Sequence, residues 1–264
     1  MKLVTDLRDH IAQGRVALGT FVVELRTPAV ARILRQGGFD FMLVDTEHGC
    51  YDPATVAALI QAGKQAGICP LVRVPGPEQA EIKRVLDAGA LGIMVPMCRT
   101  LEEVQQAVAS SKYPPLGRRG AHFARPHTEF VAPADAAEFM GRANRSLLTI
   151  VQIETGEAAE LVDSIAAMDG VDLLYVGPGD LSIALGHAGD ITHPAVMAVV
   201  ERTCRACAAH GKIAGCHFAT PQVLPELRAL GVRLVGYGAV IRMLRDGVER
   251  AGQAALRALG QTPA

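Results

Sequence analysis

The sequence lacks any long run of apolar residues. No run approaches the ~18 residues that a membrane-spanning helix needs. The first ten residues also lack the apolar centre of a secretion signal, because charged and polar side chains interrupt them at Lys2, Asp6, Arg8, Asp9 and His10. We therefore expect a cytoplasmic protein that does not insert into a membrane.

The chain also lacks an excess of charge of either sign. Its 26 Lys and Arg residues nearly match its 27 Asp and Glu residues, so the formal net charge is -1. Proteins that bind nucleic acid or an anionic membrane surface carry a basic face. The balance gives no support for either partner, and a small-molecule partner is expected instead.

The cysteines do not form a pattern that demands disulfides. The chain has six, and in a large protein without a secretion signal such residues are expected to be free thiols. Cys204 and Cys207 have the spacing of a redox or zinc motif. They lie inside a helical stretch rather than after a strand, which argues against that interpretation.

Strand and helix patterns alternate along the whole chain of 264 residues, half of which are hydrophobic. We expect strands at residues 17–21, 41–47, 69–74, 92–97, 147–154, 173–177, 213–218 and 234–240. We expect helices at residues 5–13, 28–36, 54–65, 79–86, 101–111, 158–167, 180–185, 194–210, 221–230 and 242–259.

Eight such alternations in a chain close to ~250 residues predict a (β/α)₈ TIM barrel with an extra helix at its N-terminus. A doubly wound open sheet is the competing fold. That fold normally carries a glycine-rich phosphate turn after its first strand, and residues 20–24 contain no glycine. No linker or low-complexity segment interrupts the pattern, so residues 1–264 are expected to form one domain.

Polar residues gather where the expected strands end, which in a TIM barrel is where the chemistry occurs. The amino ends of the same strands show no comparable set of charges. Each residue alone would suit a structural ion pair, but the whole set at one rim favours an active site. The set comprises Asp45, Glu47, His48, Arg73, Gln152, Glu154, the turn Gly177-Pro178-Gly179-Asp180, and His217.

Two of these residues suggest a metal site. Glu154 and Asp180 follow adjacent strands, and a pair of carboxylates suits a hard cation such as Mg²⁺ or Mn²⁺. Zinc is disfavoured because no His-x-His or His-Glu-x-x-His pattern serves the rim. The turn before Asp180 opens a helical stretch whose free N–H groups would receive a carboxylate.

Three further residues suggest proton and oxyanion chemistry. Arg73 could hold a carbonyl or enolate oxygen, because its guanidinium is planar and permanently charged. His48 changes charge near neutral pH, and Asp45 could orient it as a base. With the metal pair, these residues suit chemistry through a metal-stabilised enolate of a 2-keto acid.

Lysine is too scarce to support the covalent alternative. A Schiff-base enzyme needs a lysine at the barrel mouth. The five lysines lie in helices, at a helix end, at the N-terminus, or, for Lys212, before a strand rather than after it. A metal-dependent route is therefore favoured over an imine.

Several motifs resemble a known family when they are read together. Over residues 17–250 the chain resembles the class II pyruvate aldolases of the HpcH/HpaI family, which includes 4-hydroxy-2-oxoheptanedioate, 2-dehydro-3-deoxyglucarate and 2-keto-3-deoxy-L-rhamnonate aldolases. The motifs are Asp45-Thr-Glu47-His48, Leu71-Val-Arg73, Val95-Pro96-Met97, Tyr113-Pro-Pro-x-Gly117-x-Arg119-Gly120, Val151-Gln152-Ile-Glu154-Thr155 and Gly177-Pro178-x-Asp180-Leu181-Ser182.

The resemblance implies a divalent cation, Mg²⁺, Mn²⁺ or Co²⁺, on Glu154 and Asp180, chelated by the keto acid. It implies that Arg73 binds the keto or enolate oxygen, and that His48, paired with Asp45, moves protons through water. Glu47 would hold water bound to the metal. The substrate would also meet Gln152 and the backbone at Gly179 and Asp180.

The resemblance also bears on the acceptor and on assembly. Arg119 matches a position near the acceptor carboxylate, although the segment from Tyr113 to Arg145 also suits a solvated basic loop or a subunit contact. His217 departs from relatives that commonly have an apolar residue there, on the acceptor side, which leaves acceptor choice open. Family members form homo-hexamers, trimers of dimers, that exchange the last helix between neighbours.

The expected reaction is therefore the reversible retro-aldol cleavage of a 4-hydroxy-2-keto acid to an aldehyde and pyruvate or hydroxypyruvate. Two rivals stay open at this point. One is a citryl-CoA-type lyase subunit on the same kind of barrel. The other is a non-catalytic barrel that binds a keto acid as a sensor.

Overall fold

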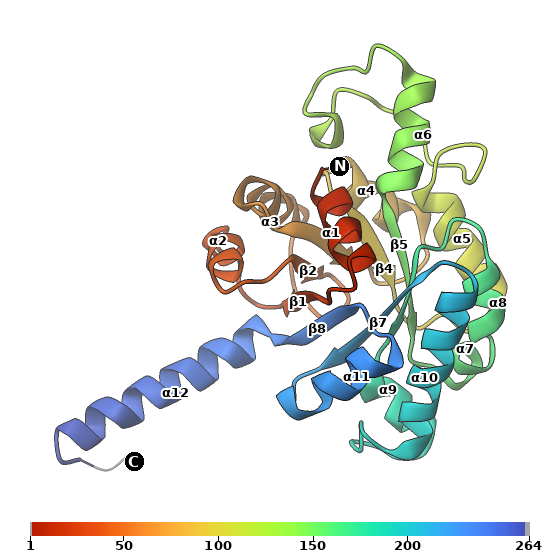
Figure 1. Ribbon diagram of the computed structural model, residues 1–264. Coiled ribbons are helices and arrows are strands. Elements are labelled where there is room, and N and C mark those ends of the chain that lie inside the picture. The colour runs from red at the N-terminus through yellow and green to blue at the C-terminus, as the bar shows by residue number, and fades with distance from the viewer. Residues whose placement is uncertain (1, 262–264) are drawn as a thin grey trace.

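The computed structural model describes residues 2–261, and within them eight parallel strands close into a barrel (Figure 1). Each strand pairs with the next in the sequence, and the last pairs back with the first. The predicted TIM barrel is thus confirmed. The strands are β1 (Ala17–Val22), β2 (Phe41–Asp45), β3 (Cys69–Arg73), β4 (Gly92–Val95), β5 (Leu148–Ile153), β6 (Leu173–Val176), β7 (Ile213–Phe218) and β8 (Leu234–Ala239).

Helices surround the barrel, and most of them cover its outside (Figure 1). They are α1 (Lys2–Ala12), α2 (Ala29–Gln36), α3 (Pro53–Ala66), α4 (Gln79–Asp87), α5 (Leu101–Ser111), α6 (Ala136–Ser146), α7 (Gly156–Glu160), α8 (Val162–Ala167), α9 (Pro178–Ala184), α10 (Pro194–Ala209), α11 (Leu224–Leu230) and α12 (Val240–Ala258). Two 3₁₀ turns, η1 (Pro126–Thr128) and η2 (Pro221–Val223), complete the set.

The period-two alternation of the strands divides the core into two layers. On β2, Phe41 and Leu43 belong to the cluster inside the barrel, whereas Met42 and Val44 belong to the layer between strands and helices. Successive strand residues point to opposite faces, so each strand supplies both layers. The same alternation directs Asp45, the next residue in phase with Leu43, toward the barrel axis.

Several strands end one or two residues earlier than the sequence indicates. β2 ends at Asp45 rather than at residue 47, and β6 ends at Val176 rather than at residue 177. Thr46 and Gly177 each still donate one backbone hydrogen bond to the neighbouring strand, to Arg73 and Ile153 respectively. The backbone therefore stays extended for a residue or two beyond the end of each strand. This explains why the strands predicted from the sequence are slightly too long.

Two helical regions also differ from the prediction. The helix expected at 158–167 is divided into α7 and α8. The segment from Tyr113 to Arg145, expected to be loop, contains most of α6, whose first turn is capped by the Asp135 side chain. Phe139 and Asn144 are its buried residues, so the apolar period is too weak to announce a helix.

Helix α1 closes the amino end of the barrel. Its Val4 and Leu7 join the inner core cluster, and its Arg8 lies 2.6 Å from the Asp172 carboxylate just before β6. Lys112, which is almost fully buried, reaches the same carboxylate at 2.7 Å. The amino end is thus plugged, which leaves the carboxyl ends of the strands as the open rim.

Helix α12 projects away from the barrel (Figure 1). Only Val240, at its start, is buried, while Leu244 and Val248 are 49% and 64% exposed. Among the residues described, no helix is both long and apolar enough to cross a membrane.

All six cysteines are free thiols. Cys204 and Cys207 are buried within α10, and burial raises the pKa of each thiol, to about 11 and about 12. A thiol that stays protonated is a poor nucleophile and metal ligand, so this burial favours packing within the helix over a redox or zinc role for the C-x-x-C spacing.

The close packing of β1 against β2 gives a test of the fold. A Cβ on Gly19 would lie far inside van der Waals contact with the Phe41 ring. We expect Gly19→Ala to lower the free energy of unfolding by about 1–3 kcal/mol, because the ring is held in the core. Gly141→Ala in α6, where the nearest atom is 3.5 Å away, should instead raise it by about 0.5–1 kcal/mol. Urea titration of both variants measures this; equal stability of the two would contradict the packing.

Candidate active site

Arg73, at the end of β3, is the buried cation around which the rim residues are arranged. Its Nε and Nη2 atoms donate to the two carboxylate oxygens of Asp45 at 3.0 and 2.6 Å. Its Nη1 lies 2.9 Å from Oε2 of Glu47 as an ion pair. The guanidinium carbon also lies 4.7 Å from the centre of the Phe21 ring. Three groups, from two strands and one loop, therefore fix this side chain.

The strand register explains the pair. Asp45 and Arg73 are direct partners in the parallel ladder of β2 and β3. Leu43 and Leu71 precede them by two residues and both lie inside the barrel. The side chains of Asp45 and Arg73 consequently point inward next to each other.

Glu154 follows β5 by one residue and is also buried. The backbone N–H of Met97 donates to its Oε1 at 2.8 Å, and the side-chain amide of Gln152 donates to its Oε2. A Cβ on Gly177 would lie 2.8 Å from that same Oε2. The sixth strand therefore needs glycine there, so that its end can pass close to the carboxylate.

Like charges surround Glu154. The pKa of Glu154 is raised to about 7, chiefly by burial and also by the nearby carboxylates of Glu47 and Asp180, while the hydrogen bond from Met97 and the charge of Arg73 oppose this rise. Glu47 shows the same trend: burial raises its pKa, Arg73 lowers it, and Asp45 and Asp180 raise it again. The three acids Glu47, Glu154 and Asp180 thus share one electrostatic environment.

Arg73 balances only part of this negative charge. Burial alone would lower its pKa, but the carboxylates of Asp45, Glu47 and Glu154 outweigh burial, and the pKa is raised. The guanidinium stays charged, as arginine does in proteins.

Asp180 lies in the first turn of α9 and is exposed at the rim. The N–H of Leu181 donates to Gly177 O as the first bond of this turn. The N–H groups of Gly179 and Asp180 precede that bond and have no partner within the helix. Both therefore remain able to meet a ligand at the mouth of the barrel.

His48 has a different partner from the one that the sequence indicates. Its side chain is 65% exposed, and its Nε2 lies 3.9 Å from Oε2 of Glu47. Asp45 reaches it only through the backbone N–H of His48, at 3.4 Å. The expected pairing of the imidazole with Asp45 is not formed, because Arg73 occupies both oxygens of that carboxylate.

The donor set at the rim suits an oxygen-preferring cation. No group of three or more His, Cys, Asp or Glu residues that could hold a metal occurs in residues 2–261. Two carboxylates, Glu154 and Asp180, are nevertheless enough for Mg²⁺ or Mn²⁺, which keep water or substrate oxygens in their other positions. An added cation would also relieve the repulsion that raises the pKa of Glu154.

His217 lies inside the barrel at the carboxyl end of β7. Its ring meets the Phe21 ring edge-on, with centroids 5.0 Å apart. Burial, together with the charges of Arg73 and Arg242, lowers its pKa to about 4. The imidazole is therefore neutral at physiological pH.

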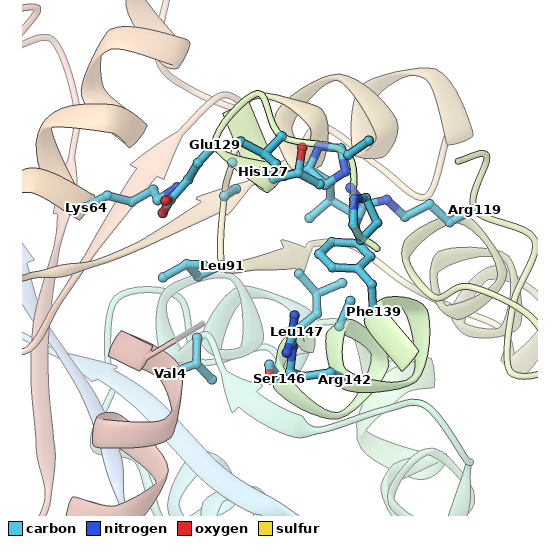
Figure 2. Close-up of a pocket in the computed structure, with 18 of the residues that line it drawn as sticks. Val4, Lys64, Leu91, Arg119, His127, Glu129, Phe139, Arg142, Ser146 and Leu147 are labelled. Atoms are coloured by element: carbon cyan, nitrogen blue, oxygen red, sulfur yellow. The ribbon is translucent and has the colours of Figure 1, made fainter. Parts of the chain in front are cut away.

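Arg119 does not lie at the carboxyl rim of its own subunit. It lies 3.3 Å from the Asp87 carboxylate and stacks on the Tyr113 ring. It lines a cavity of about 470 Å³ beside Leu91 and Leu147, which precede β4 and β5 (Figure 2). This is the amino end of the barrel, because the chain returns there after α5. The expected contact between Arg119 and a substrate is thus not formed within one subunit.

Three site residues escaped the sequence reasoning. Phe21 separates Arg73 from His217, and Tyr175 lies fully buried inside the barrel. Alternation along β1 and β6 could have placed both inside. Met97 supplies the N–H to Glu154 from a backbone with φ of 55°, which a non-glycine residue seldom adopts. The sequence carries no signal for that conformation.

Comparison with known proteins agrees with this geometry. The sequence profile of the HpcH/HpaI aldolase/citrate lyase family matches residues 18–240. The chain is 34% identical over 240 residues to a 5-keto-4-deoxy-D-glucarate aldolase of Shigella dysenteriae serotype 1 (strain Sd197), which covers 91% of this chain and 92% of that protein.

Solved structures agree as well. The crystal structure of an HpcH/HpaI aldolase from Desulfitobacterium hafniense DCB-2 matches with a TM-score of 0.86 and 31% identity over 98% of both chains. The crystal structure of the citrate synthase SbnG matches with a TM-score of 0.81 and 28% identity over 94% of this chain and 98% of that one. The chain therefore belongs to the HpcH/HpaI aldolase/citrate lyase family and is a carbon–carbon lyase of the aldolase type.

Proposed function

We propose that the protein is a divalent-metal-dependent aldolase that reversibly cleaves a 4-hydroxy-2-keto acid to an aldehyde and pyruvate or hydroxypyruvate. One observation carries the proposal: three carboxylates, Glu47, Glu154 and Asp180, share the rim with the fixed cation Arg73. A 2-keto acid offers two adjacent oxygens, which suit a cation and a guanidinium together.

Glu154 and Asp180 are the residues that would hold the metal. Bound there, a divalent cation supplies Lewis-acid charge that makes the carbon next to the keto group more acidic. Gln152 and Met97 keep the Glu154 carboxylate in place through their hydrogen bonds. Glu47, held by Arg73, would orient water at this site rather than bind the metal itself.

Arg73 would bind the keto oxygen as negative charge develops on it. Its guanidinium is already oriented by Asp45 and Glu47, so little reorganisation accompanies the reaction. The N–H groups of Gly179 and Asp180 would receive the carboxylate of the keto acid. Together these groups position the donor with its reacting carbon toward the open mouth.

His48 is the group that would move the proton. It is exposed at the rim and close to Glu47, so water can connect it to the substrate hydroxyl. Its partner within the subunit is Glu47 rather than Asp45. The acid–base function thus rests on an imidazole that has access to solvent.

The substrates of relatives suggest where an assay should begin. The curated relative at 34% identity is named as a 5-keto-4-deoxy-D-glucarate aldolase. That keto acid is accordingly the first candidate substrate, and a panel of aldehydes with pyruvate extends the search in the synthetic direction.

Metal removal tests the mechanism. We expect EDTA to abolish retro-aldol turnover and Mn²⁺ or Mg²⁺ to restore it. The reason is that Arg73 alone cannot offset the negative charge that develops on the keto oxygen. Glu154→Gln should weaken Mn²⁺ binding, measured calorimetrically, by more than the roughly 10–100-fold that loss of a residue supporting a metal ligand costs.

Glu157→Gln is the matched control, since Glu157 is an exposed acid one turn further along, in α7. It should bind Mn²⁺ as the wild type does. Full turnover in metal-free protein would rule out the metal-dependent route, and equal Mn²⁺ affinity in Glu154→Gln and wild type would refute the ligand assignment.

Replacement of His48 tests the proton transfer. We expect His48→Asn to lower kcat by about 100-fold or more, the usual effect of losing a general acid–base group, while Mn²⁺ affinity stays near that of the wild type. His210→Asn, a change of the same kind at the end of α10, should leave kcat unchanged. Wild-type kcat in His48→Asn would remove the imidazole from the mechanism.

The similarity to a citrate synthase keeps a second reaction in view. A lyase acting on a citrate-like substrate or on a CoA thioester would use the same barrel. Cleavage of a citryl thioester, with no activity on 4-hydroxy-2-keto acids, would decide for that reaction. Binding of pyruvate without turnover of any aldehyde would instead indicate a sensor.

We further infer that α12 pairs with a neighbouring copy of the chain, in an assembly such as a hexamer. Its apolar residues Leu244, Val248 and Ala251 recur at helical spacing, and the first two are exposed. A projecting helix with an uncovered apolar stripe gains stability when a partner covers it.

The assembly can be tested by light scattering. We expect Leu244→Asp combined with Val248→Asp to reduce the molar mass of the particle, because charges would be buried in the interface. Glu249→Lys, on the polar face of α12, should leave the mass unchanged. A wild-type protein that is already monomeric at micromolar concentration would contradict this inference.

A further inference from the structure

The part of the barrel interior next to β8 is shaped around two polar side chains, Tyr175 and His217. A Cβ on Gly236 would lie far inside van der Waals contact with the Tyr175 hydroxyl and 3.1 Å from Nδ1 of His217. A Cβ on Gly215 would lie 2.7 Å from the Tyr175 ring. Glycines thus provide the space in which this hydroxyl and this imidazole nitrogen approach the same point.

Both side chains face the interior. Leu173 and Tyr175 belong to the inner cluster, whereas Ala214, Cys216 and Phe218 on β7 belong to the outer layer, so His217 between them points inward. The Phe21 ring contacts the His217 ring edge-on, and the Arg73 guanidinium lies over the same Phe21 ring. The pair therefore borders the same space as Arg73.

His217 carries a buried polar atom without a partner. Its Nδ1 has no hydrogen bond among the described residues. Buried polar groups are nearly always hydrogen-bonded, and an unpaired one costs free energy. Such an atom beside a proposed reaction centre points to a ligand group that pairs with this imidazole.

The other imidazole nitrogen is open. Nε2 of His217 is not among the buried unpaired atoms, and no hydrogen bond to it occurs in residues 2–261. A neutral imidazole has one donor and one acceptor nitrogen, and a hydroxyl group can pair with either. A substrate carboxylate beside this neutral imidazole would lack a cationic partner, which Arg73 offers elsewhere in the site. An uncharged hydroxyl is therefore the substrate group that matches the imidazole best.

We propose that His217, which lies beside Tyr175, hydrogen-bonds a hydroxyl group of the substrate and selects hydroxylated reactants over their methyl isosteres. The inference rests on the proposed aldolase function and adds the substrate class. The hydroxyl belongs either to the donor, as in a 3-hydroxy-2-keto acid, or to the acceptor, as in a 2-hydroxyaldehyde. The lowered pKa of the imidazole, to about 4, keeps its acceptor nitrogen available at neutral pH.

The test compares isosteric pairs within each variant of the metal-loaded enzyme. The donor pair is hydroxypyruvate and 2-oxobutanoate, and the acceptor pair is glycolaldehyde and propanal. For one of these pairs, we expect His217→Leu to lower the ratio of kcat/KM for the hydroxylated member over its isostere about tenfold. The pair that changes identifies the reactant that carries the hydroxyl. Because each ratio is taken within one preparation, a smaller folded fraction cancels.

Conservative variants separate recognition from structure. His217→Gln keeps a hydrogen-bonding side chain and should recover part of the ratio, while Tyr175→Phe should lower it less than His217→Leu does. Tyr113→Phe is the matched control, because it removes another buried tyrosine hydroxyl, which lies at the amino end of the barrel. Its ratios should equal those of the wild type.

Two outcomes would overturn the inference, and they differ. If the wild type turns over these substrates and His217→Leu leaves both ratios unchanged, the hydroxyl recognition is wrong while the aldolase function stands. If the wild type turns over no keto acid with any aldehyde in the presence of Mn²⁺ or Mg²⁺, the proposed function fails and this inference fails with it.

Discussion

The crowding of carboxylates around one buried arginine is the constraint on which the carboxyl rim depends. Asp45 and Glu47 fix Arg73, and Glu154 and Asp180 lie nearby without an ion pair of their own among residues 2–261. Burial makes each negative charge expensive, which is why the pKa of Glu154 is raised to about 7. An isolated barrel gains nothing from such an arrangement, whereas a barrel that binds a divalent cation uses it directly.

The sequence predicted those parts of the site that follow from strand periodicity. Asp45, Arg73 and Gln152 lie in phase with apolar residues that fill the barrel, so their inward direction is set by the alternation itself. Glu154 follows in the same phase, and the glycine at 177 marks where β6 passes it. The closed parallel barrel follows from the same alternation of strand and helix.

The sequence could not predict contacts that arise from competition between side chains or from the path of a return loop. The His48 imidazole does not pair with Asp45, because the planar guanidinium of Arg73 donates to both oxygens of that carboxylate. Arg119 follows α5, which returns the chain to the amino end of the barrel. No local sequence pattern shows that this residue lies far from the carboxyl rim. Helix α6 was missed because its apolar face is narrow.

The two ends of the barrel differ in how their charged side chains are paired. The strands themselves bring few charges to the amino end, as the sequence indicates, but helices and loops do. There, Lys112 and Arg8 share Asp172, and Arg119 pairs with Asp87 beside the cavity of Figure 2. These are opposite-charge pairs within hydrogen-bonding distance. At the carboxyl end the acids outnumber their cationic partners, and that imbalance is the reason we propose a ligand site there rather than at the amino end.

Anomalous scattering from crystals grown with Mn²⁺ would locate the cation in the molecule. We expect a single strong peak at the carboxyl rim, about 2.0–2.3 Å from oxygens of both Glu154 and Asp180. We also expect Arg73 to lie on the substrate side of the ion. A peak elsewhere in the molecule, or a rim in which the two carboxylates bind no ion while the enzyme is active, would contradict the proposed metal site.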